Sequence, residues 1–342
     1  MKAARFHQYG GPEVLRYEDA PDPKPQAGEV LIRVRACGIN HVDLDLREGV
    51  SRFPLPLPHT LGIEVAGDVA AADPSGGRWK AGDRVTVNFV LYCRDCGPCR
   101  SGNNNICEER RMLGVGLPGG YAEYVLAPSH CLLPIPPAVS YEQAAATQVA
   151  FGTSWHMLIT MGKLQPGETV LINSAGSGIG SAAVQIARFA GARVLATVGA
   201  DEKREAVSKL GADVVLNHRT QDVPAEVQKL TGGRGVELVY EHVGGEIFRQ
   251  SVECVAVCGR MVTCGAHAGE VVPFDIIPLF RKQIALLGCY TATSREIATV
   301  LAMVAEKKLT PVIYKVLPLT EARRAHELIA TRQHVGKVIL AP

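Results

Sequence analysis

The pattern of hydrophobic and polar residues changes character near residue 150. Before this point the apolar residues form short β-type runs that Pro and Gly interrupt, as at Glu29–Ala36, Glu64–Ala71 and Asp83–Val87. Short strands with frequent turn signals are typical of a compact β-barrel-like domain rather than of a parallel sheet. We therefore predict a β-rich domain over residues 1–150.

Beyond residue 150, strand-like and helix-like patterns alternate, which favours stacked βαβ units and a doubly wound parallel sheet. Two amphipathic helices are expected near the start of this region, at Ser181–Ala190 and Glu202–Leu210. The tail is expected to hold two helices, at about 294–307 and 320–331, and a final strand, Lys337–Leu340. Six apolar runs match the strands of a dinucleotide-binding sheet: Thr169–Ser174, Arg193–Val198, Asp213–Leu216, Val236–Tyr240, Arg260–Cys264 and Ile284–Gly288.

Length, charge and cysteine content narrow the class of protein. A chain of 342 residues is too long for one typical core, which indicates two domains. The 36 basic and 34 acidic residues are interspersed, so no basic stripe points to nucleic acid or to a membrane surface. The N-terminus lacks the apolar stretch of a secretory signal, and no apolar run reaches the length of a membrane span. Without an export signal, the ten cysteines are expected to be free thiols or metal ligands rather than disulfides. We therefore expect a cytoplasmic protein.

A glycine-rich turn lies between the first strand and the first helix of the alternating region. Glycines let the backbone approach a pyrophosphate, and the start of a helix offers free N–H groups to it. A flexible turn is the alternative, but the flanking strand and helix favour dinucleotide binding. The predicted phosphate-binding residues are Gly176, Ser177, Gly178, Ile179 and Gly180.

The next strand ends without the acidic residue that usually binds the adenosine ribose of NAD. It is followed by a small loop and then by Lys203 and Arg204. A carboxylate would repel a 2′-phosphate, whereas these two cations would attract one. We therefore favour NADP(H) over NAD(H). The alternative is that Lys203 and Arg204 belong to a solvated first helical turn capped by Asp201.

Four cysteines follow one another closely in a single loop, with the spacing C-x2-C-x2-C-x7-C. They are Cys93, Cys96, Cys99 and Cys107. Four thiolates at this spacing can surround one Zn²⁺ tetrahedrally and leave no open position for a substrate. An iron–sulfur cluster and incidental loop cysteines are the alternatives. We predict one structural zinc per chain.

These features occur in an order that resembles the medium-chain dehydrogenase/reductase superfamily, which includes zinc alcohol dehydrogenases and quinone oxidoreductases. The resemblance implies an α/β fold: a GroES-like β-rich catalytic domain over 1–150 with a zinc lobe at about 90–110, and a Rossmann domain over 151–286 with a doubly wound parallel sheet. Residues 287–342 would return to the catalytic domain, with the substrate in the cleft between the domains. Further matching phrases are Gly10–Leu15, Cys37–Asp43, Gly119–Tyr124 and Val243–Gly245.

The chain departs from the alcohol dehydrogenase pattern where that pattern implies a second, catalytic zinc. Cys37 matches the first ligand, but Ile63 stands where the pattern has His, and Val149 stands at the third ligand position. The positions of the proton relay hold Ile39 and Val42. Aliphatic side chains have no lone pair for Zn²⁺, so the usual catalytic zinc is predicted to be absent.

An altered metal site is one alternative, with Cys37, His59 and Glu64 as ligands. The simpler interpretation of His59 is a loop histidine bonded to the backbone. Relatives without the catalytic zinc carry an Asn in the phrase that contains Asn40, so the resemblance implies Asn40 near the substrate. We expect Asp43 and Arg47 to form a supporting pair, or simply a helical ion pair.

Other residue roles follow from the resemblance. It places Thr153 against the nicotinamide, and it places Gly265, Ala266 and Gly288 at strand ends where such cofactors lie. Cys37, Asn40, Asp43 and His59 are the candidates for the catalytic site. Tyr121, Tyr290, His41 and His59 are candidate proton donors that the sequence does not rank.

Three functions remain open. Without a Lewis acid an unactivated alcohol is hard to oxidise, whereas a quinone or an activated C=C bond delocalises the incoming charge. The first hypothesis is therefore an NADPH-dependent reductase of such small molecules. The others are an alcohol dehydrogenase or carbonyl reductase with an altered or absent metal site, and a nucleotide-binding protein with little catalysis. The resemblance implies a homodimer or homotetramer with Ile284–Tyr290 at the sheet edge.

Overall fold

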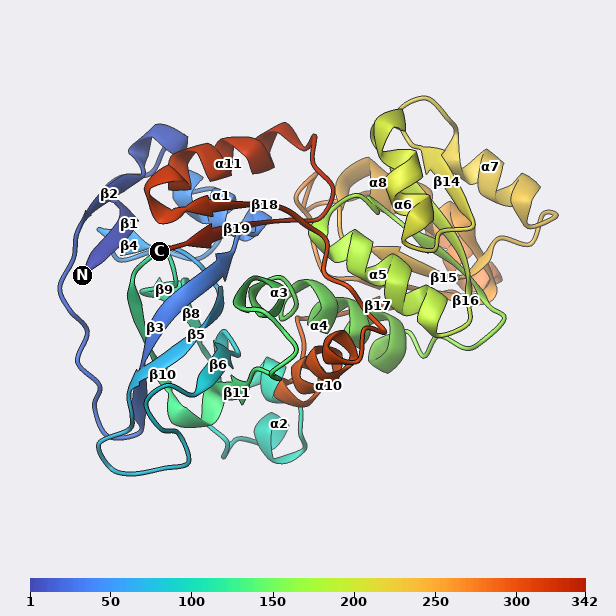
Figure 1. Ribbon diagram of the computed structural model, residues 1–342. Coiled ribbons are helices and arrows are strands. Elements are labelled where there is room, and N and C mark those ends of the chain that lie inside the picture. The colour runs from blue at the N-terminus through green and yellow to red at the C-terminus, as the bar shows by residue number, and fades with distance from the viewer. The chain divides into compact units, whose positions relative to one another are not determined.

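The computed structural model describes residues 1–342 and divides into two units (Figure 1). The first unit comprises Met1–Gln148 together with Thr293–Pro342, and the second comprises Val149–Ala292. The sequence placed the second boundary at residue 286, whereas the last strand of the second unit, β17, continues to Gly288. None of the helices is both long and apolar enough to span a bilayer.

The first unit is built around a seven-stranded sheet with the order β11-β6-β5-β3-β19-β18, in which β10 also pairs with β3. Its strands are β3 (Glu29–Gly38), β5 (Glu64–Ala71), β6 (Arg84–Val87), β10 (Tyr124–Pro128), β11 (Leu132–Pro134), β18 (Ile313–Pro318) and β19 (Lys337–Ala341). Two three-stranded sheets contain β1 (Lys2–Phe6), β2 (Arg16–Asp19), β4 (His59–Thr60), β7 (Val90–Leu91), β8 (Arg111–Leu113) and β9 (Gly116–Leu117). The α-helices of this unit are α1 (His41–Glu48), α2 (Gly97–Arg100), α3 (Tyr141–Ala145), α10 (Ser294–Ala305) and α11 (Ala322–Thr331).

Strand β3 lies inside this sheet, and its side chains alternate between core and solvent. Val30, Ile32 and Val34 are buried, whereas Arg33 and Arg35 are exposed, which is the period of two expected for a half-buried strand. The C-terminal strand β19 pairs antiparallel with the end of β3. This pairing places the end of the chain beside residues 37–40.

The second unit contains a six-stranded parallel sheet with the order β14-β13-β12-β15-β16-β17, which confirms the predicted doubly wound fold. The chain extends the sheet in one direction from β12 and then in the other, so the point of reversal lies between β12 and β15. The strands are β12 (Thr169–Ile172), β13 (Arg193–Val198), β14 (Val214–Asn217), β15 (Val236–Glu241), β16 (Val255–Thr263) and β17 (Ala285–Gly288). The α-helices are α4 (Ala150–Trp155), α5 (Gly178–Phe189), α6 (Arg204–Lys209), α7 (Val223–Leu230), α8 (Gly245–Cys254) and α9 (Ile276–Arg281).

Two of the elements that differ from the predictions do so for local reasons. Helix α5 begins at Gly178 rather than at Ser181, because the Ser177 hydroxyl accepts a hydrogen bond from the Gly180 N–H and caps the helix there. Strand β18 was not predicted. Most of its residues are partly or fully exposed at the edge of the sheet, so it lacks the continuous apolar run that identifies a buried strand.

Candidate functional site

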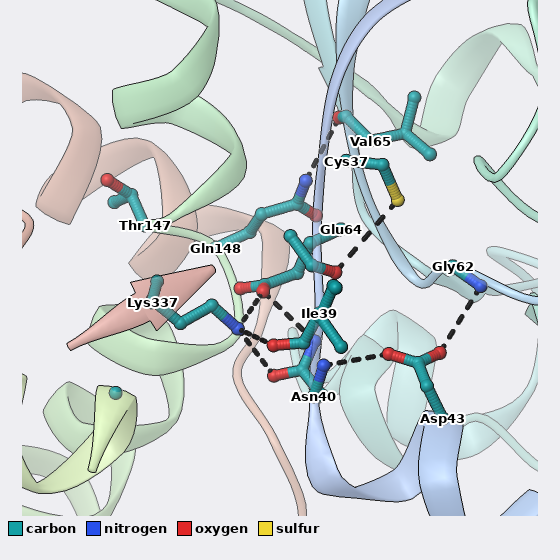
Figure 2. A network of polar contacts seen from close by, with 12 residues as sticks. Cys37, Ile39, Asn40, Asp43, Gly62, Glu64, Val65, Thr147, Gln148 and Lys337 are labelled. Carbon is teal, nitrogen blue, oxygen red and sulfur yellow. Dashed lines mark hydrogen bonds and ion pairs between the residues drawn. The ribbon is translucent and has the colours of Figure 1, made fainter. Parts of the chain in front are cut away.

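A buried network of polar side chains lies in the first unit where β3, β5 and β19 meet (Figure 2). The ammonium group of Lys337 donates to the Asn40 side-chain oxygen over 2.8 Å and to the Ile39 carbonyl over 2.7 Å. It also forms an ion pair with the Glu64 carboxylate. The Asn40 amide nitrogen donates to the same carboxylate over 3.0 Å. Asn40, Glu64 and Lys337 therefore form a closed ring of contacts, which we call the Asn40 ring.

The surrounding backbone makes room for this ring. A Cβ at Gly38 would lie 2.5 Å from a Glu64 carboxylate oxygen and 2.7 Å from the Ala145 carbonyl oxygen, so only glycine fits. The side chains of Lys337 and Glu64 are 7% and 0% exposed. Loss of one partner would leave a buried charge unpaired, which typically costs about 3–5 kcal/mol.

Asp43 holds the backbone on the other side of Asn40. Its carboxylate accepts hydrogen bonds from the Asn40 N–H over 2.8 Å and from the Gly62 N–H over 3.2 Å. Burial raises the pKa of Asp43 to about 7, and these N–H donors and the Lys337 charge only partly oppose the rise. The first turn of α1 and the Gly62 loop are therefore tied to one carboxyl group.

The expected pair between Asp43 and Arg47 is wrong. Arg47 is buried on α1, and it donates to the Gly10 carbonyl over 3.0 Å and to His326 Nδ1 over 2.9 Å, with Glu48 as its ion-pair partner. The two residues have different partners because Asp43 lies at the start of the helix, where the free N–H groups are, while Arg47 lies near its end.

His326 connects Arg47 to Tyr121. Because Arg47 is a donor, His326 Nδ1 accepts, and His326 Nε2 carries the proton toward the Tyr121 hydroxyl 3.1 Å away. Burial, together with the Arg47 charge, lowers the pKa of His326 to about 3. Burial also raises the pKa of Tyr121 well above its ordinary value. Since Tyr121 is completely buried and bonded to His326, it is a connecting group within the first unit.

Cys37, His59 and Glu64 do not come together as metal ligands. His59 lies in β4, where its Nε2 contacts the Gly114 carbonyl over 3.1 Å. The Cys37 thiol contacts the Gly38 carbonyl over 3.9 Å, and burial raises its pKa well above the ordinary value. Glu64 belongs to the Asn40 ring. The simpler interpretation of His59 as a histidine bonded to the backbone therefore agrees with the structure.

The four-cysteine cluster has the geometry of a zinc site. The four sulfur atoms lie within 4.8 Å of one another. The Cys93–Cys107 and Cys96–Cys107 sulfur distances are 3.6 and 3.9 Å, close to the separation of about 3.8 Å that tetrahedral zinc with bonds of 2.3 Å requires. Backbone N–H groups of Asp95 and Cys96 point at the Cys93 sulfur, each over 3.4 Å, and would stabilise a thiolate there. With four thiolate ligands the site is closed to substrate.

The glycine-rich turn of the second unit joins β12 to α5. A Cβ at Gly180 would lie 2.4 Å from the Ser174 carbonyl oxygen, so this position requires glycine. Ser154 on α4 supports the turn, since its hydroxyl donates to the Ile179 carbonyl over 2.9 Å. The first N–H groups of α5, at Gly178 and Ile179, have no partner within the helix and are available to a phosphate.

Arg204, which was predicted to bind the cofactor, has several partners within the fold. Its guanidinium donates to Asp201 over 2.7 Å, to the Val215 carbonyl over 3.1 Å and to the Gln221 side chain over 2.7 Å. These bonds tie α6 to β14, so Arg204 is committed to the fold. Gly199 follows the end of β13 and faces His218 and Arg219. A Cβ at Gly199 would lie 3.3 Å from the His218 ring and 3.5 Å from the Arg219 guanidinium.

The remaining predicted cofactor residues lie in the second unit as well. Gly265, Ala266 and Gly288 line one cavity of about 470 Å³ at the carboxyl ends of β15, β16 and β17. Thr153 on α4 is buried, and its hydroxyl has no hydrogen-bond partner. A buried hydroxyl without a partner fits a position that contacts a polar ligand.

Sequence reasoning missed Lys337, His326 and Arg219. Lys337 is the one charged residue in a strand that is otherwise apolar, and this was the available signal. His326 lies on the buried face of α11, where a histidine among apolar residues has no local sign of its partner.

Two family models match this chain. Residues 26–137 match the alcohol dehydrogenase GroES-like domain, and residues 178–306 match the zinc-binding dehydrogenase family. Human quinone oxidoreductase is 32% identical over 99% of this chain and 97% of its own length. An NAD-dependent alcohol dehydrogenase of Sulfurisphaera tokodaii is 29% identical over the full length of both chains. A solved NAD-dependent alcohol dehydrogenase structure is 38% identical over both full chains, with a TM-score of 0.94.

The matched domains cover most of the chain, and the relatives align from end to end. Their names divide between quinone oxidoreductases and alcohol dehydrogenases, so the comparisons leave the substrate open. They agree with the fold described above. The chain belongs to the medium-chain dehydrogenase/reductase superfamily and is an NAD(P)-dependent oxidoreductase.

Proposed function

We propose that the protein transfers a hydride from NADPH to a quinone or to an α,β-unsaturated carbonyl compound without a catalytic zinc. The observation that carries this proposal is the Asn40 ring. Glu64, which follows the aliphatic residue at the expected His position, is paired with a lysine ammonium group instead of lying free beside a metal. Ile63 itself is buried and offers no lone pair.

The chemistry that remains needs a hydrogen-bond donor rather than a Lewis acid. When bound, the reduced nicotinamide supplies the hydride. Asn40 is half-buried, and one N–H of its amide is used by Glu64, which leaves the second N–H for an oxygen of the substrate. As the carbonyl oxygen gains negative charge during the reaction, this donor would stabilise it more than it stabilises the ground state.

NADP(H) is proposed as the cofactor because of the charges beside Gly199. Asp201 at this strand end accepts hydrogen bonds from Arg204 and Asn217. Burial lowers the pKa of His218, and the charges of Arg219 and Lys203 lower it further. A ribose 2′-phosphate at this strand end would meet Arg219 and Lys203 rather than Arg204.

We also propose one structural zinc per chain, in the closed four-cysteine cluster, and a homo-oligomer. Strand β17 is the last strand of the parallel sheet, so one side of its backbone is unpaired. Val257, Ile276 and Phe280 lie on neighbouring segments and are 68%, 62% and 62% exposed. An unpaired edge beside large exposed apolar side chains is typical of an interface, and pairing of β17 with a second copy would cover it.

Steady-state assays with two classes of substrate test the proposed reaction. The protein should oxidise NADPH with p-benzoquinone or a 2-enal, with kcat/KM at least roughly 100-fold above that for oxidation of a primary alcohol with NADP⁺. Asn40→Ala should lower kcat for the reduction by about 10²–10³-fold. Faster alcohol oxidation would instead support the alcohol dehydrogenase alternative. Tight NADPH binding without turnover of any quinone, enal or aldehyde would support a nucleotide-binding protein.

A further inference from the structure

The two charges of the Asn40 ring determine which way the Asn40 amide faces. An asparagine side chain presents an oxygen on one side and an NH₂ group on the other, and rotation by 180° exchanges them. Lys337 has only donors and contacts one side of the amide over 2.8 Å. The Glu64 carboxylate has only acceptors and contacts the other side over 3.0 Å. The rotated amide would place its NH₂ against the ammonium group and its oxygen against the carboxylate.

The contacts of the ring restrain each of its members. The three hydrogens of the Lys337 ammonium group are used by Asn40, Glu64 and the Ile39 carbonyl. Glu64 cannot move toward β3, because its carboxylate already fills the space above Gly38. The Asn40 backbone is fixed separately by Asp43. Both ends of the asparagine are therefore held.

We propose that Lys337 and Glu64 are positioning residues that hold the Asn40 amide with its second N–H directed at the substrate oxygen. The proposal rests on the proposed function, in which Asn40 is the donor. The pair acts on the reaction only through Asn40, so neither residue needs to touch the substrate. This arrangement explains why two buried opposite charges, Lys337 and Glu64, which are 273 residues apart, meet at one neutral amide.

Lys337→Met tests the proposal, because methionine has a similar length and no charge. The amide then loses one of the two partners that distinguish its oxygen from its nitrogen, and kcat for quinone or enal reduction should fall about 10-fold, which is part of the 10²–10³-fold that one oxyanion donor supplies. The KM for NADPH should stay within about twofold, since the turn that binds the phosphates lies in the second unit. Lys337→Arg should restore at least half of the activity, because arginine also has only donors.

A double-mutant cycle separates positioning from a general structural effect. In the Asn40→Ala background, Lys337→Met should lower kcat by less than about twofold, because there is no amide left to orient. An effect of the same size in both backgrounds would overturn the proposal. Lys315→Met, on the adjacent strand β18, is the matched control and should leave kcat unchanged.

The outcomes distinguish this proposal from the proposed function. If the wild-type protein reduces no quinone or enal, the proposed function itself fails. If Asn40→Ala loses activity and a folded Lys337→Met keeps it, only the positioning role is refuted. Should Lys337→Met not fold, Glu64→Gln replaces it in the same cycle, because a glutamine can donate as well as accept and so no longer selects the Asn40 nitrogen on its side of the amide. Full activity of Glu64→Gln would then contradict the proposal.

Discussion

Replacing Asp43 with Asn should change how the stability of the first unit depends on pH. Burial raises the pKa of Asp43 to about 7, whereas the carboxyl of an unfolded chain titrates near 3.8. Between these values the folded protein holds a proton that the unfolded chain has lost. The folded state therefore becomes less stable as the pH rises from about 4 to 7. Each pH unit costs about 1.4 kcal/mol, so the loss amounts to about 4 kcal/mol.

His326 acts in the opposite direction over nearly the same range. Its folded pKa of about 3 lies below the ordinary value of 6.5, because burial and the Arg47 charge disfavour the imidazolium. This contribution to stability is present above pH 6.5 and is lost as the pH falls toward 3. In the wild-type protein the pH dependences of stability that come from Asp43 and His326 partly offset each other. Asp43→Asn removes the pH dependence that comes from Asp43. The free energy of unfolding of the variant, relative to that of its parent, should therefore rise by about 4 kcal/mol between pH 4 and pH 7.5.

Urea unfolding followed by tryptophan fluorescence measures this difference. The chain has two tryptophans, Trp79 in the first unit and Trp155 in the second, so a Trp155→Phe parent reports on the first unit alone. Asp68→Asn is the control. Hydrogen bonds from Tyr141 and Arg35 outweigh burial and keep the pKa of Asp68 below 3.8. The effect of Asp68→Asn on the free energy of unfolding should therefore not vary with pH above pH 5. The reasoning is refuted if the effect of Asp43→Asn is equally flat between pH 4 and 7.5.

Three further predictions concern the cofactor, the metal and the assembly. Arg219→Ala should weaken NADPH binding about 10-fold and leave NADH binding unchanged in fluorescence titrations. Equal losses of affinity for both cofactors would contradict the assignment of the 2′-phosphate site. Arg204→Ala should instead lower the melting temperature. Cys107→Ser should release the zinc measured by mass spectrometry and destabilise the protein by several kcal/mol, and a variant that keeps its full zinc content would show that the cluster is not the site. Phe280→Asp should yield monomers by light scattering at micromolar concentration, and an unchanged mass would place the interface elsewhere.

Local sequence patterns predicted the regular elements well where the pattern itself determines the structure. Strand β13 has the predicted bounds, because its apolar run is continuous and buried within a parallel sheet. The start of α5 was displaced because the capping side chain, Ser177, lies inside the glycine-rich turn, where glycines hide the helical pattern. Strand β18 was missed because an edge strand is only half-buried and carries little hydrophobic signal.

The candidate site was predicted only as far as contacts are local. Asn40 and Asp43 were identified from a phrase of adjacent residues, but their partners come from distant parts of the chain. Lys337 reaches the site because β19 pairs with β3, and no local pattern specifies that pairing. Two further partners of Arg204, the Val215 carbonyl and the Gln221 side chain, come from more distant residues and could not be predicted in the same way.

We propose that one zinc per chain holds the fold while the reduction proceeds without a second zinc. Metal content and activity should be measured on the same preparation of wild-type protein and of Cys37→Ala. We expect one zinc per chain in both proteins, with full NADPH-dependent reduction in a wild-type preparation that holds a single zinc. Two zinc ions per active chain, with one lost together with activity in Cys37→Ala, would contradict it.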